Sequence, residues 1–318
     1  MDTRSVLVRM VVVVGLLLPL ASCTWFKELQ AVKRFKEAHI LYQRQDYKNA
    51  ALAYEEVIAG DPDLTTAYFY LANSYDNLYK PSRRGEEEND GFLNKAIENY
   101  KLAVSREQDQ NMQVLSMQYL VAAYGSDKLN DPSSAEPVLL EMIDLDPSDT
   151  ANYFALAKLY EDAGQYVLAE SSLTDAREVR PNDSAVYLQL AGFFNRQGEF
   201  ERTIEALETR ASYDPENPEA YYTIATYFWE KAFRDFRLTD DEKLVHVHSG
   251  LDAVEKALDL RDNYAEALVY KNILLRMEAN MEDDLDRQKA LIAEADELRD
   301  RAEQIQKQQQ GEAAAGAS

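Results

Sequence analysis

The chain has 318 residues, 46% apolar and 29% charged, a composition that fits a folded protein with a sizeable core and excludes a disordered one. Its formal net charge of −23 repels phosphate backbones, which excludes nucleic acid as a natural partner. With only 11 glycines and 9 prolines, the chain favours long helices over a many-turned β architecture.

Residues 1–22 have the three parts of an export signal. Two arginines charge the start, an apolar run covers residues 10–20, and two small residues precede Cys23. The run is too short for a membrane-spanning stop-transfer helix, which needs about 20 apolar residues. The segment Leu20–Cys23 resembles a bacterial lipobox, which implies removal of residues 1–22 and attachment of a diacylglyceryl group to the Cys23 sulfur. The alternative is an ordinary signal peptide with a cysteine there by chance.

Cys23 is the only cysteine, so the chain has no internal disulfide and no second thiol for catalysis or metal binding. By resemblance to sorted lipoproteins, Thr24 in place of Asp points to the outer membrane, with the body facing the periplasm. Trp25 and Phe26 follow almost without a linker in the segment 23–30, the lipidated N-terminus and start of the first helix. They lie either at the lipid headgroups or against the first helix pair.

The segment from Cys23 to Lys48 has a local charge of +3, although the whole chain is acidic. The basic residues are Lys27, Lys33, Arg34, Lys36, Arg44 and Lys48, against Glu28, Glu37 and Asp46. Two interpretations stay open: a chance excess over a short helix, or a basic collar facing an anionic lipid surface beside the anchor.

A repeat of 34 residues separates Pro147, Pro181 and Pro215, each at the end of an amphipathic segment. One unit reads Tyr153, Leu156, Ala157, Tyr160, Gly164, Tyr166, Ala169, Ala176, Pro181, and the next reads Tyr187, Leu190, Ala191, Phe194, Gly198, Phe200, Thr203, Leu207, Pro215. This pattern resembles the tetratricopeptide repeat (TPR), a pair of antiparallel helices A and B with fixed large and small packing positions. Small residues such as Ala157 and Ala169 fit where the two helices cross closely.

The resemblance implies an all-α fold, a TPR-type α-solenoid that winds as a right-handed superhelix. It covers residues 31–262 with about six repeats. Residues 263–306 match weakly and are expected to form degenerate repeat or cap helices, with a coiled coil as the alternative for the last of them. The polar tail 307–318 is expected to be disordered.

Two repeats carry extra residues at the turn between helices A and B, near 80–91 and 233–248. In the second, Thr239 to Glu242 has the pattern of a capping box that opens an extended helix B. Such insertions emerge on one edge of a solenoid, where they are either partner loops or tolerated decoration.

The sequence shows no motif of enzyme chemistry. His246 and His248 are two apart and point in different directions on a helix, so they cannot share a metal. Neither a glycine-rich phosphate loop nor a nucleophile in a recognisable turn occurs. We therefore expect no enzymatic activity, no cofactor, no metal and no small-molecule substrate.

In TPR proteins helix A lines the concave side, so the resemblance implies a partner-binding groove there. The expected groove residues are aromatic, apolar, amide and charged side chains on one helical face. They are Phe35, His39, Tyr42, Phe69, Asn73, Asn77, Phe154, Lys158, Glu161, Leu188, Asn195, Arg196, Tyr222, Thr226 and Trp229. An aromatic row flanked by amides and charges suits an extended peptide or a partner helix.

The expected function is a lipid-anchored scaffold that mediates protein–protein interactions during assembly of a complex in the bacterial cell envelope. In plan the chain is similar to TPR lipoproteins of pilus assembly or outer-membrane barrel assembly. The alternatives are an adaptor for cell-wall hydrolases or proteases, or an unrecognised hydrolase or sugar-binding protein that uses the acidic surface.

Overall fold

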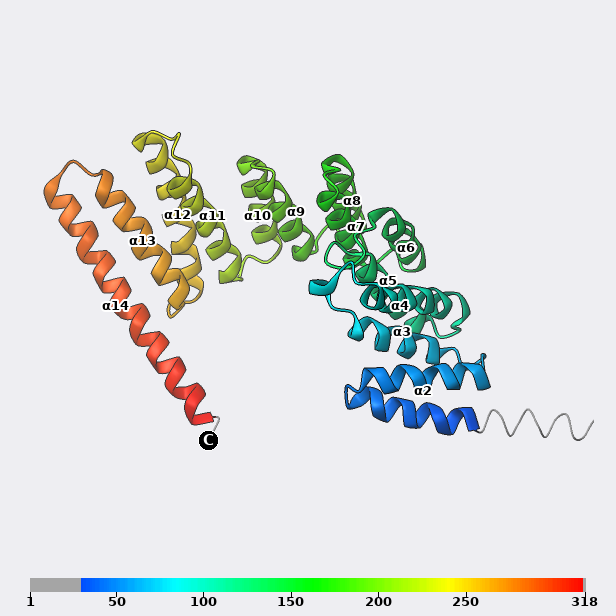
Figure 1. Ribbon diagram of the computed structural model, residues 1–318. Coiled ribbons are helices and arrows are strands. Elements are labelled where there is room, and N and C mark those ends of the chain that lie inside the picture. The colour runs from blue at the N-terminus through cyan, green and yellow to red at the C-terminus, as the bar shows by residue number, and fades with distance from the viewer. Residues whose placement is uncertain (1–29, 317–318) are drawn as a thin grey trace, which may run out of the picture. The chain divides into compact units, whose positions relative to one another are not determined.

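A computed structural model describes residues 30–316, with side chains through residue 312; the predicted export signal and Cys23 lie outside the described residues. The chain forms two compact units, Met1–Tyr166 (unit 1) and Val167–Ser318 (unit 2). Every regular element in the described part of the chain is a helix (Figure 1). None of the helices within residues 30–316 is long and apolar enough to cross a membrane.

Unit 1 is a series of helices in which each packs on the next along the chain (Figure 1). After a helix at residues 30–43 come α2 (Tyr47–Gly60), α3 (Thr66–Leu78), the short 3-10 helix η1 (Pro81–Arg83), α4 (Glu87–Arg106), α5 (Gln110–Tyr124), α6 (Pro132–Leu145) and α7 (Thr150–Asp162). Helix α3 also contacts α5, the relation expected between the A helices of adjoining repeats.

Small residues let these helices approach closely. Ala50, Ala96 and Ala135 are completely buried, and they belong to the same hydrophobic core as the fully buried rings of Tyr54 and Tyr100. Alternating small and large side chains fill the space between neighbouring helices at the density of a protein interior. The core of unit 1 therefore follows the small and large positions of the repeat.

Unit 2 continues the same plan with longer helices at its end. It contains α8 (Tyr166–Val179, whose first residue closes unit 1), α9 (Ser184–Arg196), α10 (Phe200–Tyr213), α11 (Pro218–Arg234), α12 (Asp240–Leu260), α13 (Ala265–Met281) and α14 (Leu285–Gly316). From α9 onward each helix packs on the next, and α11 also contacts α13.

Side-chain caps explain why many helices begin where they do. The carboxylates of Asp46, Asp149 and Asp183 accept hydrogen bonds from backbone N–H groups in the first turns of α2, α7 and α9. A cap of this kind satisfies donors that have no partner inside the helix. The turns inside the repeats instead need glycine, because Gly164 and Gly198 have φ values of +72° and +77°.

Both predicted insertions are largely helical. The one near residues 80–91 forms η1 and the start of α4, which is held by Asn89, a buried side chain that bonds the backbone of Lys80 and Arg83. The one near 233–248 lengthens α11 and α12 around a short turn. The predicted capping box is confirmed: Thr239 accepts a bond from the Glu242 backbone, and the Glu242 carboxylate accepts one from the Thr239 backbone.

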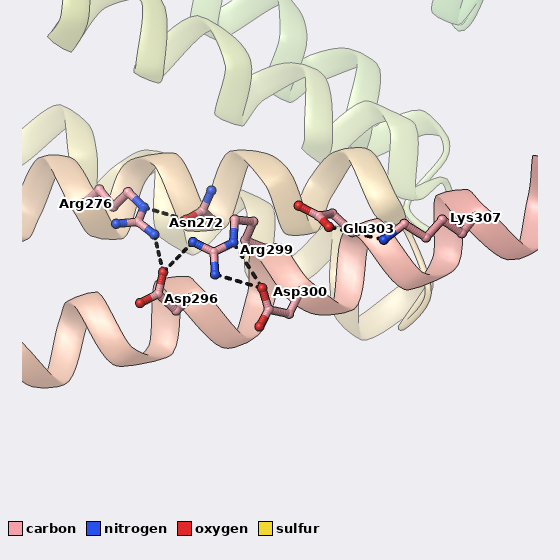
Figure 2. Close-up of polar contacts among 7 residues, drawn as sticks. All are labelled: Asn272, Arg276, Asp296, Arg299, Asp300, Glu303 and Lys307. Atoms are coloured by element: carbon pink, nitrogen blue, oxygen red, sulfur yellow. Dashed lines mark hydrogen bonds and ion pairs between the residues drawn. The ribbon is translucent and has the colours of Figure 1, made fainter.

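The last two helices pack antiparallel, with Ala295 and Ala302 of α14 buried. Figure 2 shows the polar contacts at their seam, where Arg276 of α13 donates to Asp296 of α14 at 2.6 Å. Arg299 donates to the same carboxylate at 2.8 Å. This small network lies along the exposed edge of the pair and links α14 to α13, whose packing rests on the buried alanines.

Helix α14 does not end where the sequence predicts. Arg301 reaches Asp262, just before the start of α13, and α14 then continues past that end of its partner to Gly316 (Figure 1). The expectation of a disordered tail from Lys307 is therefore wrong for residues 307–316, which are helical. Three glutamines and three alanines in this stretch are strong helix formers, which extend a helix already started by α13 packing.

Candidate partner-binding site

Three of the expected groove residues meet around one ring in unit 1. Phe35, His39 and Tyr42 lie on successive turns of the helix at residues 30–43, and their rings are 6.0, 4.9 and 5.2 Å from that of Tyr70 on α3. All three meet it edge to face, the favoured geometry for aromatic pairs. All four side chains are half-buried. They form what we call the unit 1 aromatic face.

A hydrogen-bonded network lies beneath this face. The Tyr42 hydroxyl donates to the amide oxygen of Asn73 at 2.8 Å, and the Asn73 amide donates to the Tyr100 hydroxyl at 3.2 Å. Asn77 also donates to the Asn73 oxygen, at 2.8 Å. Burial, followed by neighbouring tyrosines, raises the pKa of Tyr42 to about 12, so its hydroxyl stays a neutral donor. The network fixes the orientation of the Tyr42 ring.

Two predicted groove residues of α3 are wrong as partner contacts. Phe69 is 6% exposed and packs on Tyr70, Tyr100 and Tyr119, and Asn73 is 3% exposed. Helix α3 contacts helices on both sides, and α5 of the next repeat covers its Phe69 face. Asn77, one turn beyond Asn73, is exposed.

The α7 residues of the predicted groove are more open. Phe154 is half-buried, and Lys158 is exposed and forms an ion pair with Asp162 one turn away. Glu161 is half-buried on the same helix. Since exposed ion pairs contribute little to stability, Lys158 can exchange its partner at small cost.

In unit 2 a second aromatic group, the unit 2 aromatic face, joins α11 to α13. The rings of Tyr222 and Trp229 each lie 5.4 Å from Tyr270, both edge to face, and Phe233 stacks on Trp229 at 5.4 Å. The indole N–H of Trp229 is buried and has no hydrogen-bond acceptor within the described part of the chain. Thr226 lies between the first two rings in sequence, but its hydroxyl donates to its own helix.

The remaining predicted residues lie on α9. Leu188 is a large apolar side chain, but it is 39% exposed and therefore lies at the surface and not in the core. Arg196 is exposed, and Asn195 lines a cavity of about 520 Å³ at the turn between α11 and α12. The structure therefore does not place Leu188, Asn195 and Arg196 in the unit 2 aromatic face.

That cavity is lined by residues which the repeat pattern does not single out. Phe236, which lines the cavity, is 90% exposed, and Phe233 of α11 is 66% exposed. Lys231 and Arg237 both donate to Asp235, and these bonds hold the pKa of that carboxyl well below its usual range. Sequence reasoning identified the insertion but not these side chains, because the repeat pattern has no position for inserted residues.

The two histidines of α12 contact different helices. His246 lies against Phe200 and Phe228, at ring distances of 5.2 and 6.1 Å. His248 faces the buried Glu278 carboxylate of α13, 3.5 Å away. Among residues 30–316, histidine and acidic side chains form no group of three that could hold a metal.

Comparison with solved structures identifies the fold. The C-terminal part of a TPR repeat-containing protein from Cytophaga hutchinsonii is similar over 85% of this chain and 98% of its own, with 15% identity and a TM-score of 0.54. A tetratricopeptide repeat protein from Parabacteroides merdae covers 83% of this chain and 98% of its own, with 14% identity and a TM-score of 0.45. MamA covers 57% of this chain and 92% of its own, with 17% identity and a TM-score of 0.41.

No protein-family model matches the sequence, and no curated protein matches it. The likeness to the Cytophaga structure is one of fold. Together with the helix pairs described above, it confirms the predicted fold class: an all-α, TPR-type α-solenoid.

Proposed function

We propose that this protein is a non-enzymatic scaffold, lipid-anchored at Cys23 on the periplasmic side of the outer membrane, which holds protein partners during assembly of an envelope complex. The observation that carries the proposal is the pair of partly exposed aromatic faces, one in each unit, on helices of the A type. The lipobox-like sequence before Cys23 supports the anchor and the compartment.

Aromatic faces of this kind suit protein partners. Tyrosine and tryptophan bury a large area at low entropic cost, and they dominate the binding energy of many interfaces. The unit 1 aromatic face is held rigid by the Asn73 network, and Tyr222 of the unit 2 face is fixed against Tyr270. An extended peptide or an amphipathic helix that covers such rings gains their burial without having to order them.

The binding role is tested by crosslinking in intact cells followed by mass spectrometry. We expect specific envelope proteins to be recovered with the wild type and lost with the double variant Phe35→Ala, Tyr222→Ala, which removes one ring from each aromatic face. Val245→Ala is the matched control, because Val245 is 63% exposed on α12 and outside both aromatic faces. Recovery of no specific protein by the wild type contradicts a scaffold.

Circular dichroism of the double variant decides what a loss of partners means. Helicity close to that of the wild type assigns the loss to the surface. A collapse of helicity shows that Phe35 and Tyr222 are core residues and that the proposed surface is misplaced.

The anchor is tested separately by Cys23→Ser. The substitution removes the only sulfur that can accept the lipid, so the protein should move to the soluble fraction when the membranes of disrupted cells are washed with about 1 M salt, which screens electrostatic contacts with lipid. Retention of the Cys23→Ser chain in the salt-washed membranes contradicts lipid anchoring.

A further inference from the structure

The helix at residues 30–43 has three distinct sides. One packs on α2, with Ala31 and Ala38 at 2% and 0% exposed and Arg34 ion-paired with Glu56. The second carries Phe35 and the rest of the unit 1 aromatic face. In Figure 1 this helix forms the end of unit 1, with α2 beside it, so no other described helix of unit 1 lies against its third side.

The third side combines apolar and basic residues. Val32 and Ile40 are 43% and 48% exposed and lie two turns apart on one line of the helix. Lys33 is 80% exposed in its side chain, and Lys36 on the line between the two apolar residues is also exposed. We call this side the free face; Arg44, just beyond the helix, is exposed as well.

The charge of this region opposes that of the chain. Residues 30–48 hold five basic and two acidic side chains, a net charge of +3, in a protein whose net charge is −23. The one acidic residue on the free face, Glu37, lies 3.9 Å from Lys33 in an exposed pair of little strength. Exposed apolar groups beside lysines suit the surface of an anionic bilayer. The apolar groups enter the boundary between headgroups and acyl chains, and the lysine ammonium groups bind lipid phosphates.

The length of chain between Cys23 and the helix also limits how far the free face can lie from the proposed lipid anchor. Six residues lie between Cys23 and Gln30, so the start of the helix is seven residue steps from Cys23 and lies within about 25 Å of it. We infer that the free face, centred on Val32, Lys33, Lys36 and Ile40, binds the surface of an anionic lipid bilayer. The inference extends the proposed anchoring at Cys23, because the anchor would hold this face at a high effective concentration beside the membrane.

The test removes the anchor and measures the face alone. The chain from residue 23 onward, which keeps every described residue, carries Cys23→Ser and is sedimented with vesicles of phosphatidylglycerol and phosphatidylcholine or of phosphatidylcholine only. Salt at about 0.1 M limits electrostatic reach to about 10 Å, which screens the acidic body from the vesicle. We expect binding to the anionic vesicles and background binding to the neutral ones.

Two variants locate the contact. Lys33→Gln with Lys36→Gln should lower the partition coefficient on anionic vesicles about 25-fold, since each basic residue near such a surface contributes roughly a fivefold gain. Lys289→Gln with Lys307→Gln changes the net charge equally at side chains 74% and 76% exposed on α14, and should leave binding unchanged. Val32→Ser with Ile40→Ser should weaken binding while the helicity stays constant.

Equal binding to both vesicle types, or an equal loss with both lysine pairs, overturns the inference. So does a Cys23→Ser chain that ignores vesicles but binds an acidic peptide through Lys33 and Lys36, since the face then serves a protein. These outcomes are independent of the anchor, because failed lipidation is seen as release of the chain that retains Cys23 from salt-washed cell membranes, not in this assay.

Discussion

The amide of Asn73 lies between two tyrosine hydroxyls in the interior of unit 1, and this position makes a clear prediction. Asn73→Ala removes the acceptor of the Tyr42 hydroxyl and one donor to the Tyr100 hydroxyl, which keeps its own bond to Asp76. Each of the two lost hydrogen bonds contributes about 0.5–1.5 kcal/mol, so their loss together costs about 1–3 kcal/mol. We expect the free energy of opening of α3 and α4, measured by hydrogen exchange, to fall by about that amount.

Asn77→Ala is the control for this prediction. Asn77 donates to the same Asn73 oxygen but is exposed, so water replaces the lost contact. The variant should change the opening free energy by less than about 0.5 kcal/mol. An equal fall in the opening free energy from the two substitutions would mean that the stability of the network does not depend on the buried Asn73.

His246 gives a prediction about pH. Burial, followed by the charge of Lys231, lowers the pKa of this imidazole below its ordinary value of 6.5, against weaker opposite effects of nearby carboxylates that include Glu201 and Asp235. A lowered folded-state pKa means that the unfolded chain takes up the proton first as pH falls. The stability contribution of the neutral imidazole is therefore complete above pH 6.5 and is lost below it, down to the folded pKa.

The measurement is the melting temperature of the unit 2 helices between about pH 7.5 and pH 5.5, a range that extends about one unit on either side of the ordinary histidine pKa. The wild type should lose stability below pH 6.5, and His246→Phe should flatten that part of the profile. His248→Gln serves as the comparison, because His248 is 54% exposed in its side chain. An unchanged slope in His246→Phe would show that other groups cause the loss.

Residue by residue, the groove was only partly predictable from the sequence. Phe69 and Tyr222 occupy the same position of the repeat, so the pattern treats them alike. The structure separates them because Tyr119 of the following repeat closes over Phe69, whereas Tyr222 beside Tyr270 stays partly exposed. Burial at this position depends on a side chain one repeat away, which the period of the repeat does not specify.

At the scale of elements, the crossing of α12 with its neighbours depends on one glycine. A Cβ at Gly250 would lie 3.2 Å from a methyl of Leu274 on α13 and 3.3 Å from Cβ of Phe228 on α11. Leu274 is completely buried, so it has little room to move. Gly250→Val should therefore destabilise unit 2 by about 1–3 kcal/mol through overpacking, measured by urea denaturation.

Gly91→Val on α4 is the matched control for this crossing. Gly91 is also inside a helix, but a Cβ there meets no atom within 4 Å. Its substitution should cost no more than the small difference in helix propensity between the two residues. A Gly250→Val protein as stable as Gly91→Val would show that α12 can shift away from α11 and α13 freely.

Helix starts were easier to predict than helix ends. The Thr239 capping box is a local signal, because both of its hydrogen bonds join residues three apart in sequence. The end of α14 has no such signal. Residues 307–316 lack large apolar side chains, which favours a loop, yet they have high helix propensity and extend a helix already anchored by Ala295 and Ala302.

At the scale of the molecule, the helix pairs set how stability is distributed. In repeat proteins each helix contacts mainly its neighbours, so stability is close to a sum of local terms. The contacts within unit 2 follow this rule, since α12 packs on α11 and α13 and α13 on α14. Damage at the end of unit 2 should therefore weaken the adjoining helices and leave unit 1 unaffected.

Deletion of residues 263–318 tests this nearest-neighbour behaviour. The deletion removes α13 and α14 and uncovers α12, whose residues Val247, Val254 and Ala257 are completely buried in the intact chain. Hydrogen exchange of α11 and α12 amides should accelerate about tenfold or more, while exchange in α2–α4 should change less than about twofold. The matched comparison is a deletion after residue 306, which removes only the part of α14 beyond α13 and should leave both regions as they are. Faster exchange throughout unit 1 after the longer deletion would mean that the two units unfold as one, and that a partner bound to unit 1 would be sensitive to the state of α14.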